Sequence, residues 1–310
     1  MRPGCACVRF ITVIPLFFFL FGAVIGSFLN VCISRIPEDL SIVSPGSRCP
    51  RCLTPIEPYD NIPIFSWFLL RGKCRTCALP ISPMYPTVEL LTALFFVLTY
   101  YTFGVTLPSF KFLVFGCLII VLIVTDLRVR LLPDAVNWFG FGLALAFATR
   151  IFPGSFLGRY YRDVWIPSAH IPRILMGLPD ALLGAALGSF LLWGAATIYK
   201  LARNREGMGM GDVKMMAMVG AFLGVRGAFF TILLGTVLGS ILGTLWVVAL
   251  YVGGWKRQLA QRAARRGLAD ESSLRWAIAS QYQLPFGTFL GAGALLAVYW
   301  FPWAMSKLFL

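Results

Sequence analysis

The chain has 310 residues, of which 58% are hydrophobic, and its mean hydropathy of +0.79 is seldom reached by a soluble globular protein of this length. Apolar runs long enough to cross a bilayer recur along it, so the composition predicts an all-α polytopic membrane protein. A formal net charge of +14 would suggest nucleic-acid binding in a soluble chain, but basic loops beside membrane helices explain it here, and we expect no nucleic-acid partner.

The first apolar segment, residues 8–33, is too long for a cleaved secretion signal, and we predict a retained transmembrane helix. Residues 34–85 form a polar segment rich in Pro, Cys and Arg, and residues 86–310 form a larger membrane domain. Seven further apolar runs are predicted to be helices, which makes about eight in all: 88–103, 110–126, 135–152, 181–200, a short run at 213–224, 227–252 and 286–303.

The distribution of basic residues predicts the orientation of these helices. Eight helices place four loops on one side of the membrane, and that side carries most of the Lys and Arg residues. Basic loops favour the cytoplasm. We therefore expect the polar segment 34–85, the loop after the third helix and the glycine-rich loop before residue 212 to face the cytoplasm, with the basic loops touching anionic lipid.

Two close cysteine pairs lie in the polar segment, within "CPRC" and "CRTC". Four thiolates in two such pairs can enclose one tetrahedral zinc ion, and a segment too small for a good core gains folding energy from the metal. Disulfides or free thiols are the alternative, but a cytoplasmic location argues against disulfides. A full set of four Cys leaves no open position, so the metal would be structural. The predicted ligands are Cys49, Cys52, Cys74 and Cys77.

Three aspartates stand at the predicted cytoplasmic edge of the membrane region. Asp126 closes the third apolar run, and Asp212 follows "GMG" where the glycine-rich loop becomes an apolar run. Ionisable groups there are candidates for function. The alternatives are a pairing of Asp126 with Arg128 or Arg130, and a helix N-terminal role for Asp212. Asp134 is best explained as a helix cap or first-turn carboxylate.

Two carboxylates brought together from different helices can share a proton, so that one activates water while the other polarises a carbonyl group. Gly209 and Gly211 would let an extended strand approach Asp212, and Lys214 follows on the same helix. His170 is the sole histidine and has no predicted partner, which makes a Ser-His-Asp or Cys-His arrangement improbable. The residues favour acid–base hydrolysis by a pair of aspartates.

Five stretches of this sequence together resemble one enzyme family. "GMGD" with the following "VK" resembles the Gly-x-Gly-Asp signature of intramembrane-type aspartyl proteases. "GSFLNVCISRIP", the two cysteine pairs, "DLRVRLLPD" and "LPFGTFLGAGALL" are similar to stretches of the bacterial type IV prepilin peptidases, in the same order. The resemblance covers most of the chain, about residues 26–296.

The resemblance implies that Asp126 and Asp212 are the catalytic pair of an inner-membrane aspartyl peptidase facing the cytoplasm. Such an enzyme removes leader peptides of prepilins and pseudopilins after a glycine, and many members also methylate the new N-terminus with S-adenosylmethionine. The products would serve type IV pili or type II secretion. The cysteine segment would carry zinc. The sequence shows no strand–glycine–helix cofactor site, so the methyl transfer rests on the resemblance alone.

Other functions stay open at this point. A preflagellin-type peptidase would have other substrates, although the cysteine domain argues against it. A zinc-stabilised membrane scaffold or transporter without protease activity is a different class, but transporters more often show broken helices at mid-membrane. The segments 153–177 and 255–276 are longer than the family pattern requires. The substrate, the oligomeric state and the aspartate that holds the proton are not determined by the sequence.

Overall fold

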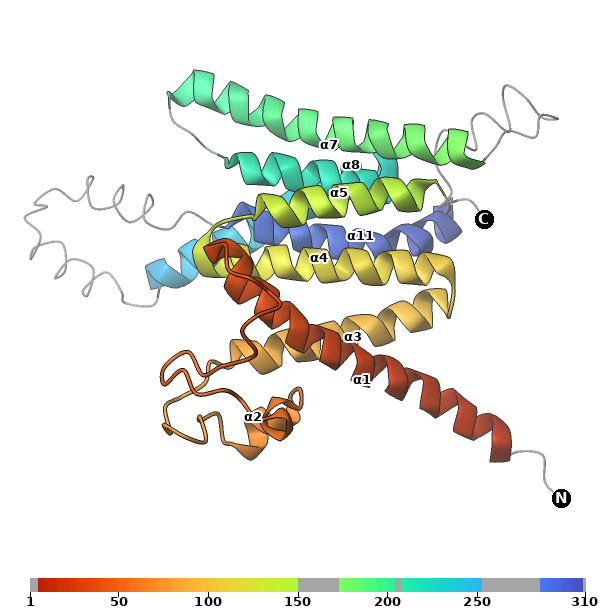
Figure 1. Ribbon diagram of the computed structural model, residues 1–310. Coiled ribbons are helices and arrows are strands. Elements are labelled where there is room, and N and C mark those ends of the chain that lie inside the picture. The colour runs from red at the N-terminus through yellow and green to blue at the C-terminus, as the bar shows by residue number, and fades with distance from the viewer. Residues whose placement is uncertain (1–4, 150–172, 205–207, 253–284, 309–310) are drawn as a thin grey trace, which may run out of the picture.

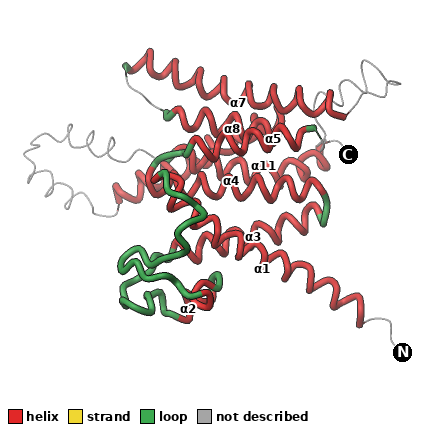
Figure 2. The backbone as a smooth tube through the Cα atoms, viewed as in Figure 1, coloured by secondary structure: helices red, strands yellow, loops and turns green. Residues whose placement is uncertain are grey.

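The computed structural model describes residues 5–149, 173–204, 208–252 and 285–308, and in these residues it is helical without a strand (Figures 1 and 2). The two long segments singled out above lie mostly outside this part of the chain. The long helices, in chain order, are α1 (Cys5–Arg35), α3 (Met84–Phe103), α4 (Leu107–Val129), α5 (Asp134–Ala148), α7 (Arg173–Arg203), α8 (Met210–Val252) and α11 (Phe286–Leu308).

Each of the eight predicted apolar runs corresponds to a helix or to part of one. Two of these runs, 213–224 and 227–252, both lie in α8. Gly224 breaks the helix with φ 72° and ψ −176°, a conformation that a residue with a side chain rarely adopts. The chain reverses there, so the run predicted at 213–224 packs as a separate rod. Five helices in the described residues are long and apolar enough to cross a membrane, and α5 and α11 are shorter apolar helices. The chain is a multi-pass membrane protein.

Glycines allow these helices to approach closely. On α1, a Cβ atom at Gly26 would lie 2.6 Å from the Glu89 Cα of α3. Between α8 and α11, a Cβ atom at Gly293 would lie 2.7 Å from the Gly235 backbone nitrogen. Lipid-embedded helices gain little from the hydrophobic effect between them, so close van der Waals packing at small residues holds the bundle together.

The helices run back and forth, so that the ends of several helices lie together at one end of the bundle, at the left of Figure 1. At this end α4 ends and α8 and α11 begin. The segment between α1 and α3 lies next to them, beyond the ends of the long helices. We call this the site end. The segment contains only short helices: η1 (Ile36–Glu38), η2 (Pro58–Asn61) and α2 (Phe65–Leu69). All three predicted aspartates and all four predicted metal ligands lie at the site end.

Candidate active site and metal site

Asp126 lies in the last turn of α4, and its carboxylate points into the bundle. The residue is 6% exposed. Its Oδ2 accepts hydrogen bonds from Thr288 of α11, at 2.7 Å from the backbone N–H and 2.9 Å from the side-chain hydroxyl. Arg128 and Arg130 are exposed, whereas Asp126 is buried. The bonds recorded for this carboxylate go to α11, and the alternative of a surface pairing with one of these arginines is not what the fold shows.

Asp212 lies in the first turn of α8 and is 7% exposed. Its position relative to Asp126 follows from Gly287, which lies between them at the start of α11. A Cβ atom built on Gly287 would be 2.9 Å from Asp212 Oδ1 and 3.0 Å from Asp126 Oδ2. Both carboxylate oxygens therefore lie within 3.0 Å of a single point. The fold brings together two acidic groups that are far apart in the chain.

Leu132 covers this pair from the loop between α4 and α5. Its Cδ1 atom would be 2.9 Å from the same Gly287 Cβ position. On its other side the Leu132 Cβ packs against Gly211, where an added Cβ atom would approach to 3.0 Å. The glycine predicted to admit a close approach to Asp212 is in fact approached by this leucine side chain. Gly209 adjoins the carboxylate, since a Cβ atom there would be 3.8 Å from Asp212 Oδ2.

Asp134 and Lys214 form an ion pair beside the buried carboxylates. Lys214 Nζ donates to Asp134 Oδ2 at 2.6 Å, and this bond joins the first turn of α5 to the second turn of α8. The Asp134 side chain is 57% exposed, unlike Asp126 and Asp212. As expected, Asp134 occupies the first turn of its helix, directly after the N-cap residue Pro133. The pair links two helices at the surface of the site end.

The four predicted metal ligands come together in the segment between α1 and α3. The Sγ atoms of Cys49, Cys52, Cys74 and Cys77 all lie within 4.8 Å of one another, and those of Cys49 and Cys77 are 3.9 Å apart. A tetrahedral zinc ion with Zn–S bonds of ~2.3 Å requires Sγ–Sγ distances of about 3.8 Å. Hydrogen bonds to Thr54 lower the pKa of the Cys52 thiol to about 6. The donor set fits a tetrahedral metal ion.

The two cysteine pairs have the same local structure, which is the repeat that sequence reasoning missed. Backbone N–H groups at Leu53 and Ala78 donate to the carbonyls of Cys49 and Cys74, and Leu53 and Ala78 both have positive φ. Isolated bridges join Arg48 to Pro55 and Lys73 to Pro80. The signal was present as two matching stretches, "RCPRCLTPI" and "KCRTCALPI". Each pair forms a tight turn that presents two thiols to the shared centre.

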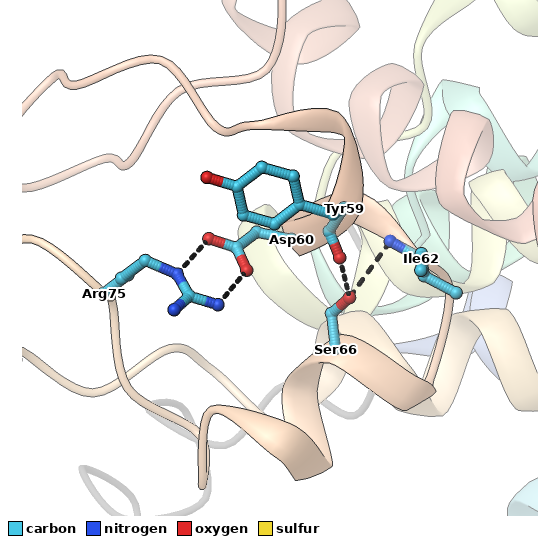
Figure 3. Close-up of polar contacts among 5 residues, drawn as sticks. All are labelled: Tyr59, Asp60, Ile62, Ser66 and Arg75. Carbon is cyan, nitrogen blue, oxygen red and sulfur yellow. Dashed lines mark hydrogen bonds and ion pairs between the residues drawn. The ribbon is translucent and has the colours of Figure 1, made fainter.

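Polar contacts connect the residues between the two cysteine turns with the second cysteine turn and with α3 of the bundle. Arg75 donates to both carboxylate oxygens of Asp60, at 2.7 and 2.6 Å, and lowers the pKa of that carboxyl (Figure 3). Ser66 bridges the Tyr59 carbonyl and the Ile62 N–H, both at 3.1 Å. The Ile64 N–H donates to Glu89 Oε2 of α3 at 2.7 Å. These bonds orient the metal-binding segment on the end of the bundle.

Two residues of the site lie in a stretch that sequence reasoning used only for the resemblance. Gly287 and Thr288 belong to "LPFGTFLGAGALL", and neither was predicted to touch an aspartate. The sequence offers one weak signal, a Gly-Thr pair at the start of an apolar helix, where backbone N–H groups lack intrahelical partners. Such donors suit a carboxylate, but the carboxylate comes from another helix.

Comparisons with known proteins identify the family of the chain. The chain matches the model of the Bacterial Peptidase A24 N-terminal domain over residues 20–103 and that of the Type IV leader peptidase family over residues 113–244. No solved structure matches it.

Similar curated proteins are named prepilin leader peptidase/N-methyltransferase. The protein from Myxococcus xanthus is 37% identical over 75% of this chain and 63% of its own length. Those from Xanthomonas campestris and Klebsiella pneumoniae are 33% and 34% identical over 74% and 71% of this chain, and over 80% and 90% of their own lengths. The chain thus spans somewhat less than two thirds of the first of these relatives and most of the other two. The chain belongs to the type IV leader peptidase family.

Proposed function

We propose that this protein is a membrane aspartic endopeptidase that removes the leader peptide of type IV prepilins or pseudopilins, with Asp126 and Asp212 as its catalytic pair. The observation that carries the proposal is the approach of both buried carboxylate oxygens to the same point at Gly287. The relatives' names supply the substrate class. A scaffold or transporter without protease activity is not favoured by this family membership.

The chemistry follows from two carboxyl groups that share one proton. The ionised carboxylate takes a proton from water while the water oxygen bonds to the scissile carbonyl carbon, and the protonated carboxyl gives its proton to the carbonyl oxygen. The resulting diol then collapses. The first carboxyl protonates the leaving nitrogen as the carbon–nitrogen bond breaks, and the second recovers a proton from the diol.

The site end suits a substrate that is itself a membrane helix. Asp126 and Asp212 lie within one turn of the ends of apolar helices, where the polar leader of a prepilin would meet its apolar segment. We infer that the site end faces the cytoplasm of the bacterial inner membrane, since the connecting segments whose flanking helices end or begin there contain most of the Lys and Arg residues of the sequence.

We infer that the metal held by the four cysteines is a structural zinc ion. It supplies folding energy to a segment with little apolar core of its own, and all four ligand positions are filled by Cys. The segment touches the bundle through Glu89, so its folding supports the position of α3. The ion takes no part in the hydrolysis that we propose. We also propose that the chain has three parts: a first transmembrane helix at residues 8–33, a zinc-binding segment at 34–85 and a peptidase membrane domain at 86–310.

Loss of one cysteine ligand should deplete the metal before it changes the chemistry. We expect Cys77→Ser to abolish stoichiometric zinc and to reduce the amount of protein in the membrane several-fold, while activity per folded molecule falls less. Cys117→Ala, a cysteine of α4 outside the cluster, is the control and should keep its zinc. Metal analysis of purified protein and quantitative blotting provide the measurements. A full complement of zinc in Cys77→Ser would contradict the assignment.

Methylation of the new N-terminus is the second activity in the relatives' names, and it would use S-adenosylmethionine as methyl donor. No strand–loop–helix site occurs in the described residues.

The direct test is reconstitution of the purified protein with a synthetic prepilin segment that contains the leader, a glycine and a following phenylalanine. We expect one cut after the glycine, and with S-adenosylmethionine present we expect one added methyl group on the new N-terminus. Mass spectrometry reads both events separately. Intact peptide after prolonged incubation, with protein that is folded and holds zinc, would refute the peptidase proposal.

A further inference from the structure

The first turn of α11 provides two hydrogen-bond donors to one oxygen of Asp126. Thr288 is the third residue of α11, so its backbone N–H has no intrahelical acceptor and is free to donate outward. It donates to Asp126 Oδ2 at 2.7 Å. The Thr288 hydroxyl lies 2.9 Å from the same oxygen and 3.5 Å from the Ile123 carbonyl. Because a hydroxyl has a single proton, the shorter contact identifies Asp126 as its acceptor.

The environment of the second carboxylate is different. The Asp212 backbone N–H donates to the Gly209 carbonyl at 3.2 Å. The Asp212 carboxylate has a backbone contact at Gly209, but no side chain among the described residues donates to it. Thr288 therefore makes the pair asymmetric. Donors directed at a carboxylate stabilise its ionised form, and hydrogen bonds to charged groups are stronger than those between neutral groups.

We propose that Thr288 is a positioning residue that holds Asp126 as the ionised member of the pair, so that Asp126 activates the water and Asp212 carries the shared proton. This inference rests on the proposed function. With Oδ2 held by both Thr288 donors, Oδ1 of Asp126 is the oxygen left to accept the proton of water. Asp212 then donates its proton to the carbonyl oxygen of the scissile bond. The assignment resolves a choice that the sequence leaves open.

The geometry also explains how Thr288 alone can hold the Asp126 carboxylate in one orientation. The N–H fixes the position of Oδ2, and the hydroxyl adds a second contact from the same residue, so rotation of the carboxylate would break both bonds. Thr288 is β-branched, and its side chain has few accessible rotamers in a helix. Therefore α11 sets the orientation of the Asp126 carboxylate, whereas the backbone of Asp126 belongs to α4.

The test separates the hydroxyl from the rest of the residue. Thr288→Val keeps the shape and the backbone N–H but removes the hydroxyl, and we expect kcat to fall about 10- to 100-fold with KM nearly unchanged. Thr288→Ser restores the hydroxyl and should restore most of kcat. Thr125→Val is the matched control, because Thr125 is a buried threonine next to Asp126 whose hydroxyl donates to carbonyls of its own helix. It should keep the wild-type kcat.

Wild-type kcat in Thr288→Val, or a Thr288→Ser variant as slow as Thr288→Val, would overturn the inference. If Thr288→Val does not accumulate, Thr288→Ala against Thr288→Ser gives the same contrast, and zinc content with thermal unfolding checks that the compared proteins are folded. Asp126→Asn, assayed in parallel, separates the two claims. An active Asp126→Asn would defeat the proposed function, whereas an inactive Asp126→Asn beside a fully active Thr288→Val would defeat the role of Thr288 alone.

Discussion

Replacement of either buried aspartate by asparagine should abolish leader removal. Asp126→Asn and Asp212→Asn keep the size of the side chain but remove the carboxyl group that accepts or donates the proton, and we expect each to lower kcat by about 10²–10⁴-fold or more. Both residues are at most 7% exposed, so the amide must fit into a packed environment. Co-expression with a prepilin, followed by separation of precursor and mature forms, measures the loss.

Asp134→Asn is the control for this pair. Asp134 stands at the same end of the bundle, but it is exposed and bonded to Lys214, and surface ion pairs contribute about 0–1 kcal/mol. We expect processing within a fewfold of wild type, with unchanged abundance of the protein. Full processing by either buried-aspartate variant would refute the catalytic assignment. Equal loss in all three variants would instead indicate damage to the site end as a whole.

Gly287→Ala should inactivate the enzyme while leaving it folded. The added methyl group would lie 2.9 Å from Asp212 Oδ1 and 3.0 Å from Asp126 Oδ2, in the space where both carboxylates approach. Carboxylates displaced by a fraction of an ångström to an ångström can cost about 10²-fold in rate. Alanine is a better helix former than glycine, so α11 itself should not suffer. The measurement is kcat in detergent or nanodiscs, with thermal unfolding as the check on folding.

Gly194→Ala is the matched control. Gly194 also lies in an apolar helix, α7, but a Cβ atom there meets nothing within 4 Å. It should have wild-type activity and stability. If Gly287→Ala cleaves at the wild-type rate, the two carboxylates do not approach at Gly287 during catalysis, and the geometry on which the proposal rests is wrong.

Local features of the sequence were sufficient to predict the helices and the cysteines of the metal site. The apolar runs predicted the helical rods, and the prediction of a polytopic helical protein is confirmed by the described residues. The four cysteines meet as predicted, because close spacing within each pair limits where the thiols can point. The internal likeness of the two cysteine turns was also visible in the sequence, through the proline that ends each of them.

The sequence located the break in α8 only as a gap between two apolar runs. Gly224 stood at the end of the predicted run 213–224, but the positive φ that reverses the chain depends on how both halves pack. Likewise, the sequence placed Gly211 beside Asp212 as an opening for a substrate. The fold places Leu132 against it, because the loop after α4 returns over the start of α8.

By itself, the sequence determined that this is a multi-pass helical membrane protein, which residues offer thiolates to a metal, and which acidic side chains stand at the ends of apolar helices. Composition and short-range spacing carry that information. Only the tertiary structure decided that Asp126 and Asp212 meet at Gly287 and that Thr288, 162 residues from Asp126, binds its carboxylate. Such contacts depend on the packing of α4, α8 and α11 against one another, and a local pattern of residues contains no record of that packing.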